Sequence, residues 1–285
     1  MTPCPSCGAD RGHLLGCEHG TIALPAAPPV SLDDGAPDTT RARAWGVPIA
    51  LAVAALLSFT MPGSLLLRLC FGMWLHEAGH ALASWFCGVI AVPLPWVTMG
   101  AQVRSPFFIA LLFGGLGALC YRLWRREQQR LVPLPASLGA LLLIGVLVPF
   151  RHATTFIVFC GDGGALVLGT VFMLGAVLLP DELRVSRGGL RWGYLVIGAG
   201  AFMDAFVTWV KAWRDWAELP LGRNEGSGLS DASRLIDVSG WSEAGLVRSY
   251  LALGLVCLGV LAALTAWRLL SRGHRSPQSL VPSPP

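Results

Sequence analysis

The sequence predicts an all-α fold: a polytopic bundle of about six or seven transmembrane helices, preceded by a short Cys/His module. The chain of 285 residues is 54% hydrophobic and 13% charged, with a mean hydropathy of +0.60, whereas soluble domains carry about 25% charged residues. Several apolar runs reach the roughly 20 residues that cross the hydrocarbon of a bilayer. Arginines and tryptophans gather near the ends of these runs, as is typical beside a membrane surface.

The apolar runs lie within residues 46–270, which we expect to form one transmembrane domain. They cover approximately 46–67, 69–92, 107–124, 131–150, 154–180, 192–212 and 249–270. Basic stretches lie at 122–130, 181–191 and 268–275. Because short arginine-rich connections mark the cytoplasmic side, the net charge of +4 indicates membrane topology and not nucleic-acid binding. We expect a multi-pass protein in contact with the lipid bilayer, in a bacterial cytoplasmic membrane.

The side of the membrane on which the N-terminus lies stays open. If the basic stretches are cytoplasmic, three spans before residue 122 place the N-terminus outside. A cytoplasmic N-terminus requires that one of the first three runs does not span. A re-entrant piece near Pro93 and Pro95, or a break at Pro62-Gly63, would allow this.

The N-terminus carries a possible second metal site. Residues 1–20 are polar and contain four soft ligands, Cys4, Cys7, Cys17 and His19. Four protein ligands fill a tetrahedral zinc site, so this zinc would be structural in a small ribbon-like module. The spacing is shorter than in standard ribbons, and a disordered segment with incidental thiols is the alternative. Residues 21–45 are predicted to be a flexible linker and 271–285 a disordered tail.

The sequence His76-Glu77-Ala-Gly-His80 is the main functional motif. Two histidines four residues apart lie on one face of a helix and can hold one zinc ion. Glu77 is then placed to take a proton from a zinc-bound water, as the general base of a metallopeptidase. Each ionisable group in an apolar run costs about 2–3 kcal/mol on insertion scales, which favours a compensating metal over a chance match.

The segment from His76 to Ala83 resembles the metal-binding helix of the site-2 protease family of intramembrane zinc metallopeptidases. The similarity is greatest to its smaller bacterial branch without a PDZ domain. The resemblance implies a catalytic zinc, a catalytic Glu77 and cleavage of a membrane-protein or transmembrane-peptide substrate. Gly79 is the small residue that the family often has inside the motif. We expect it to allow close approach of a neighbouring helix or the metal.

The resemblance also implies that an aspartate on a later segment completes the zinc site. The family's full motif, with its Asn and Pro, is absent, so three aspartates remain candidates. Asp162 lies in Cys-Gly-Asp-Gly-Gly, which resembles the Asp-Gly of the family and makes it the favoured ligand. Asp231 lies in a Ser-Asp-Ala segment that resembles the smaller branch, but the polar loop 213–248 would have to fold back. Asp204 lies within an apolar run and is the third choice.

These observations together predict a zinc-dependent intramembrane endopeptidase. The alternative is a catalytically inactive membrane binding or scaffold protein that retains a metal site, because the motif that positions substrate in the family is missing. Tryptophans 209, 213 and 216 are interpreted as an interfacial belt beside the membrane.

Overall fold

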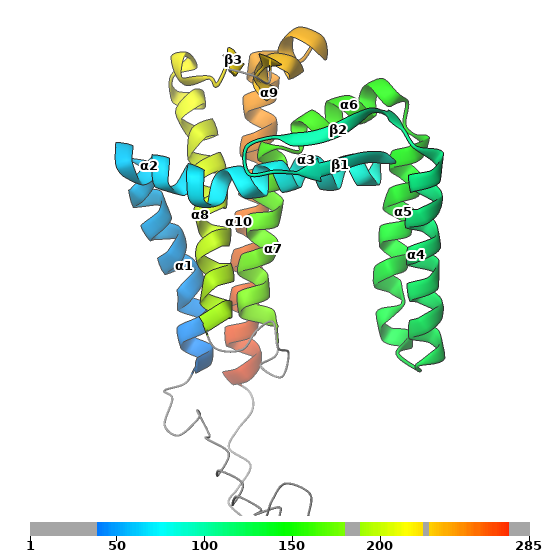
Figure 1. The fold of residues 1–285 in the computed structure, drawn as a ribbon. Coiled ribbons are helices and arrows are strands. Elements are labelled where there is room, and N and C mark those ends of the chain that lie inside the picture. Colours follow the sequence, from blue (N-terminus) through cyan, green and yellow to red (C-terminus); the bar gives the residue numbers. More distant parts are fainter. Residues whose placement is uncertain (1–38, 180–188, 225–227, 274–285) are drawn as a thin grey trace, which may run out of the picture. The chain divides into compact units, whose positions relative to one another are not determined.

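The computed structural model describes residues 39–179, 189–224 and 228–273, most of which are helical (Figure 1). The helices are α1 (Thr39–Ser58), α2 (Met61–Leu67), α3 (Met73–Phe86), α4 (Pro106–Arg125), α5 (Pro133–Leu147), α6 (Phe150–Phe159), α7 (Asp162–Leu178), α8 (Gly189–Arg214), α9 (Asp231–Ser233) and α10 (Glu243–Gly273). Shorter helical turns cover Arg68–Gly72, Gln129–Leu131, Trp216–Glu218 and Arg234–Val238. The strands are β1 (Val89–Pro93), β2 (Thr98–Arg104), β3 (Arg223–Asn224) and β4 (Gly228–Leu229).

Two antiparallel strand pairs, β1–β2 and β3–β4, interrupt the helices. The described residues are otherwise mostly helical, which is compatible with the predicted all-α membrane bundle. In the longer pair, Val92 lies opposite Met99 and Pro93 opposite Thr98. The longer pair forms for a local reason, since β-branched Val and Ile side chains favour a strand and prolines disfavour a helix.

Four helical segments are long and apolar enough to cross a membrane: Pro106–Arg125, Gln129–Leu147, Gly189–Arg214 and Glu243–Trp267. The pair α6 and α7, bent by 59°, gives a fifth if it is one broken span, and Trp45–Ser58 is a shorter apolar helix. These segments are compatible with an integral membrane protein. By length and composition the described residues thus hold four or five spans, against the six or seven predicted.

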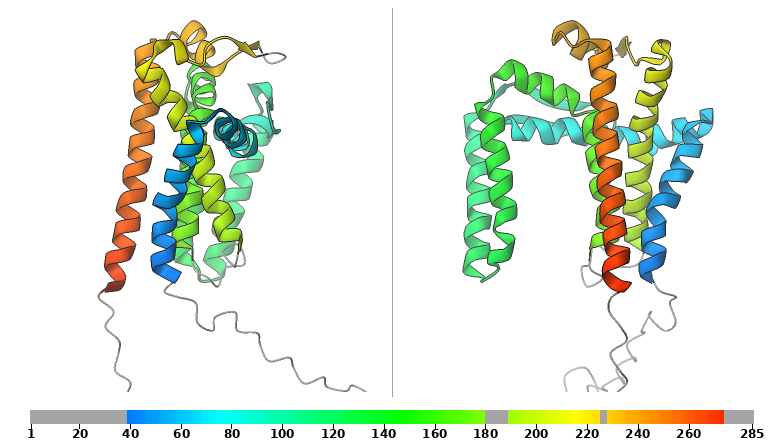
Figure 2. Two further views of the ribbon diagram at one scale, coloured as in Figure 1. Left: turned by 90° about the vertical axis from the view of Figure 1, so that its left-hand side faces the viewer. Right: turned by 180° about the vertical axis from the view of Figure 1, so that it is seen from behind.

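Helix α3 accounts for part of this difference, because it runs across the other apolar helices. Figure 1 shows α1, α7, α8 and α10 side by side and α4 paired with α5, while α3 and the β1–β2 pair lie crosswise. The two views of Figure 2 show the same arrangement. Gly88, with a φ of +74°, turns the chain from α3 into β1. The apolar run 69–92 is therefore a crosswise element and not a span.

Helices α7 and α8 pack against each other more extensively than any other pair of described helices. A Cβ on Gly169 would lie 2.7 Å from the carbonyl oxygen of Gly198, and a Cβ on Gly198 would lie 2.6 Å from that of Gly169. Fully buried side chains surround this contact, among them Leu166, Met173 and Phe202. Small residues that let two helix backbones approach in this way are typical of membrane helix pairs. The pair provides a firm support for the site residues that project from its ends.

Arg104 fastens β2 to the neighbouring helices. Its guanidinium donates to the carbonyl oxygens of Cys87 at 3.0 Å, Gly145 at 2.9 Å and Val148 at 2.6 Å. Cys87 directly follows α3 and Val148 directly follows α5, so one side chain satisfies carbonyl groups at two helix ends. The strand is thereby held beside α3, with Thr98 at its start.

Candidate metal centre

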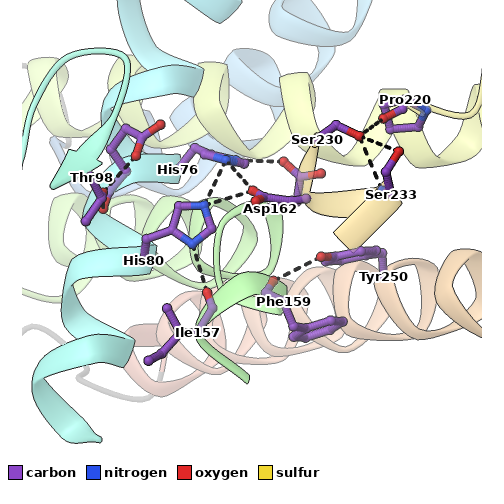
Figure 3. Close-up of polar contacts among 12 residues, drawn as sticks. His76, His80, Thr98, Ile157, Phe159, Asp162, Pro220, Ser230, Ser233 and Tyr250 are labelled. Carbon is purple, nitrogen blue, oxygen red and sulfur yellow. Dashed lines mark hydrogen bonds and ion pairs between the residues drawn. The ribbon is translucent and has the colours of Figure 1, made fainter. Parts of the chain in front are cut away.

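Two histidine nitrogens and one carboxylate oxygen converge where α3 faces α9 (Figure 3). The Nε2 atoms of His76 and His80 lie 3.1 Å apart. Asp231 Oδ2 lies 3.0 Å from Nε2 of His76 and 2.8 Å from Nε2 of His80. The two imidazoles come from successive turns of α3, as the spacing of the motif predicts.

The partners of the other two ring nitrogens fix the tautomers of the histidines. His80 Nδ1 lies 2.8 Å from the carbonyl oxygen of Ile157, which can only accept a hydrogen bond. His76 Nδ1 lies 2.9 Å from Asp162 Oδ1, a carboxylate oxygen that also accepts. Each Nδ1 therefore carries the hydrogen. In the neutral rings both Nε2 atoms then present lone pairs toward Asp231.

With both rings neutral, three electron-pair donors face one another with no hydrogen between them. Such lone pairs repel and lack hydrogen-bond partners, unless a cation or additional protons lie between them. Within the described residues, His76, His80 and Asp231 form a group close enough to share one metal ion. Two imidazoles and one carboxylate are a donor set of catalytic zinc sites, in which a fourth position stays open. The three side chains therefore fit a zinc ion.

Asp231 is charged and available as a ligand. Burial alone would raise the pKa of its carboxyl, but with no metal between the three groups, hydrogen bonds and positive charge from protonated His76 and His80 outweigh burial and hold this pKa well below its usual range. Its side chain is 26% exposed, so solvent and an incoming ion can reach it.

Asp162 lies behind His76 and not at the position between the two Nε2 atoms. Its Oδ1 contacts His76 Nδ1 at 2.9 Å, and its Oδ2 accepts from the indole N–H of Trp209 at 2.9 Å. Because Nδ1 and Nε2 point to different sides of the ring, a carboxylate bound to Nδ1 orients the histidine without ligating. Among the three predicted aspartates, Asp231 is thus the one that lies between the two Nε2 atoms, and the identity of the third ligand stays a prediction.

Trp209 is also not the interfacial residue that the sequence suggested, because its side chain is only 1% exposed. Its ring stacks on Tyr250, with centroids 4.2 Å apart and planes at 21°. Tyr250 stacks on Phe159 at 4.4 Å, and its hydroxyl donates to the carbonyl oxygen of Phe159 at 3.1 Å. This aromatic stack holds the indole in place, so that its N–H stays directed at Asp162.

The polar loop after α8 folds back over α3 and brings Asp231 to the histidines. Ser230 caps α9 by accepting from Ser233 N at 3.2 Å, and its hydroxyl donates to the carbonyl oxygen of Pro220 at 2.9 Å. Leu235, one turn further on, is fully buried in the core. Asp231 is thus anchored on both sides by contacts that do not involve a metal.

Glycines make room for the site where α3 meets the start of α7. A Cβ on Gly161 would lie 2.6 Å from both His76 Cε1 and His80 Nε2, so a larger residue would displace the imidazoles. A Cβ on Gly79 would lie 2.8 Å from Gly164 Cα. The expectation that Gly79 allows a neighbouring helix to approach closely is confirmed.

Glu77 lies beside the metal group and lines the same cavity of about 440 Å³. Its side chain is 6% exposed. The hydroxyl of Thr98 lies 2.7 Å from Glu77 Oε2 and 2.9 Å from the carbonyl oxygen of Glu77. One hydroxyl has one hydrogen and two acceptor lone pairs. Thr98 can therefore donate to a charged Glu77, or donate to the carbonyl and accept from a protonated Glu77.

The remaining predicted site residues do not join this group. Asp204 lines the same cavity, but its carboxylate packs so closely against Gly72 that no Cβ would fit there. The predicted N-terminal ligands Cys4, Cys7, Cys17 and His19 lie outside the described residues. Their zinc site stays a prediction.

Sequence reasoning missed three groups that support the motif: Thr98, the indole of Trp209 and the carbonyl of Ile157. A threonine at the start of a strand and a backbone carbonyl carry no signal of their own. The tryptophan could have been found only by asking which donor satisfies a carboxylate inside an apolar run.

No model of a known protein family, no curated protein and no solved structure matches this chain. Its described part is characterised by apolar helices of spanning length and by a His, His, Asp group beside a buried glutamate.

The positioning role of Asp162 can be tested with Asp162→Asn, which we expect to weaken zinc binding about 10–100-fold, the usual cost of losing the partner of a metal-bound histidine. Trp209→Phe keeps a stacked ring but removes the indole N–H, so we expect a smaller loss in the same direction. Zinc dissociation constants of the purified proteins, from competition with a chelator, measure both effects. Trp213→Phe, on the same helix but 62% exposed, is the matched control. An equal loss in the control would contradict the proposed role.

Proposed function

We propose that this chain is a zinc-dependent endopeptidase that cleaves a peptide bond within or beside the membrane. The observation that carries the proposal is that the buried carboxylate of Glu77 lines the same cavity as His76, His80 and Asp231. Three protein ligands leave a metal position open for water and substrate, as catalytic sites do and structural sites do not.

The residues of the cavity have complementary roles in this proposal. A zinc ion held there would polarise the substrate carbonyl and make water more acidic. Glu77 takes a proton from the attacking water and returns it to the leaving amine. Thr98 can hydrogen-bond to the glutamate in either protonation state, which keeps the carboxyl in one place during the transfer.

An extended peptide suits the cavity as substrate. In the described residues β2 pairs with β1 on one side only, and Gly100, Ala101 and Gln102 of β2 line the cavity. The free edge of a strand can bind an extended segment through backbone hydrogen bonds. A substrate helix would have to unwind locally, because helical hydrogen bonds occupy the same backbone groups.

Metal removal tests the proposed function. We expect a strong chelator to abolish cleavage of membrane-spanning peptides by the detergent-purified protein, and stoichiometric zinc to restore it. Mass spectrometry of the products measures cleavage, and elemental analysis measures zinc. Zinc binding that requires His76 and His80, without cleavage of any such peptide, would instead favour the inactive binding or scaffold protein.

A further inference from the structure

The metal group lies near one end of the apolar helices. Asp162 is the first residue of α7, Trp209 lies near the end of α8, and Asp231 lies on the connection that leads into α10. In Figure 1 α7 begins at the level of α3 and the β1–β2 pair, in the upper part of the helices, while α8 and α10 continue above α3 to the connection that carries α9. The turn between α4 and α5 lies at the opposite end in Figure 1 and in both views of Figure 2. Helices that cross a bilayer in this arrangement hold the site near one membrane surface.

Six apolar elements run between these two ends: the four spans, the bent pair α6–α7 and the shorter α1. Figure 1 shows that α1, α5 and α8 run toward the site, whereas α4, α7 and α10 run away from it. α1 therefore begins, and α10 ends, at the end of the helices opposite the site. The first three apolar runs therefore contain at most two crossings, because α3 lies crosswise.

Arginines mark the end opposite the site. The nine residues 122–130, at the turn between α4 and α5, carry Arg122, Arg125, Arg126 and Arg130. Arg191, at the start of α8, is buried and donates to the carbonyl oxygen of Leu179. The sequence 268–275, where α10 ends, is again arginine-rich. Short arginine-rich connections next to membrane spans lie in the cytoplasm.

Connections at the site end are longer and carry arginine and lysine at lower density, and some of these residues have structural partners. The 47 residues 59–105 contain Arg68 and Arg104 as their only arginines or lysines, Arg151 lies between α5 and α7, and the 38 residues 211–248 contain Lys211, Arg214, Arg223, Arg234 and Arg248. Arg104 is bound to the carbonyl groups at the ends of α3 and α5. Lys211, near the end of α8, donates to the carbonyl oxygen of Ser58 at 3.3 Å. The difference in arginine density between the two ends thus favours one orientation.

We propose that the metal group faces the non-cytoplasmic surface of the membrane, with the start of α1, the end of α10 and the α4–α5 turn in the cytoplasm. A statement about the substrate follows from this orientation and rests on the proposed function. The substrate is a membrane-anchored protein, and the bond that is cleaved lies at the non-cytoplasmic surface. The segment that enters the cavity then needs no passage across the bilayer, which would be costly for any charged residue in it.

Cysteine labelling tests the orientation without any need for cleavage. The full chain, with its eight cysteines replaced by serine, receives one cysteine as Val238→Cys or Gln128→Cys. Val238 is 75% exposed at the site end, and Gln128 is exposed at the α4–α5 turn. We expect a membrane-impermeant maleimide to label Val238→Cys in intact bacterial spheroplasts. Gln128→Cys should react only after the membrane is disrupted.

The reverse labelling pattern, or equal labelling of both positions in intact spheroplasts, overturns the proposed orientation. If the cysteine-free chain does not accumulate, the unmodified chain with a C-terminal fusion answers the same question. Green fluorescent protein fused to the C-terminus is expected to fluoresce, as it does in the cytoplasm. Alkaline phosphatase fused at the same position is expected to be inactive, and an active fusion would overturn the proposal. The same labelling in a Glu77→Gln background separates orientation from activity. In a chain with Glu77 intact, correct labelling without cleavage of any peptide leaves the orientation standing and refutes only the peptidase.

Discussion

Glu77→Gln is expected to abolish peptide cleavage while leaving zinc bound. General acid–base catalysis contributes about 10²–10⁴-fold, and an amide cannot take up the proton. The metal stays, because His76, His80 and Asp231 are unchanged. The fold stays as well, since the amide oxygen can still accept from the hydroxyl of Thr98. Product formation by mass spectrometry and zinc content by elemental analysis measure the two effects separately.

Asp204→Asn is the matched control for Glu77→Gln, because it makes the same chemical change in another carboxylate of the same cavity. We expect this variant to retain zinc and most of the cleavage. Cleavage by Glu77→Gln at the rate of the parent chain would refute the enzyme. Equal losses of cleavage in both variants would show that cleavage depends on the negative charge of the cavity and not on a proton transfer at Glu77.

Asp231→Ala is expected to weaken zinc binding more than about 100-fold, beyond the usual loss for a partner that only orients a ligand. The variant removes one of three ligands and leaves two imidazoles that bind zinc weakly. Chelator competition on the purified protein measures the affinity. The absorption spectrum of the cobalt-substituted protein reports the change in ligand set. Asp237→Ala, an exposed carboxylate shortly after α9, is the control and should bind zinc as the parent chain does.

The comparison of Asp231→Ala with Asp162→Asn decides which carboxylate completes the site. The geometry requires the larger loss from Asp231, whose Oδ2 faces both Nε2 atoms. If Asp231→Ala keeps its zinc while Asp162→Asn loses it, Asp162 is the ligand and Asp231 only covers the cavity.

The motif on α3 could be predicted from the sequence because its geometry is local. Helix periodicity alone places His76 and His80 on one face, and the structure brings their Nε2 atoms to 3.1 Å. Gly79 could be predicted for the same reason, since a small residue on the same helix permits the close contact with α7.

The third ligand could not be chosen in this way, because Asp231 lies 151 residues after His80. Asp162 and Asp231 both reach His76, and only the packing decides which ring nitrogen each one meets. That packing depends on the buried Leu235 and on the hydrogen bonds of Ser230. None of these contacts has a periodic signal in the sequence.

Hydropathy identified the run 69–92 as apolar but could not tell whether its helix runs along the other helices or across them. An apolar helix can lie across a bundle as well as along it, and its neighbours decide. Here the contact of Gly79 with Gly164 and the turn at Gly88 set the crosswise direction. The number of spans was therefore less predictable than their existence.

The α4–α5 pair connects the proposed general base to the thickness of the bilayer. α4 has no buried residue, and Pro135 and Leu142 are the buried residues of α5, so lipid must cover most of their surface. A helix of 20 residues is about 30 Å long, close to the hydrocarbon thickness of a typical bilayer. Thinner or thicker membranes make such helices tilt. Arg104 joins the end of α5 to β2, and Thr98 of β2 contacts Glu77. We therefore expect membrane thickness, through the tilt of α5, to affect the geometry of the site.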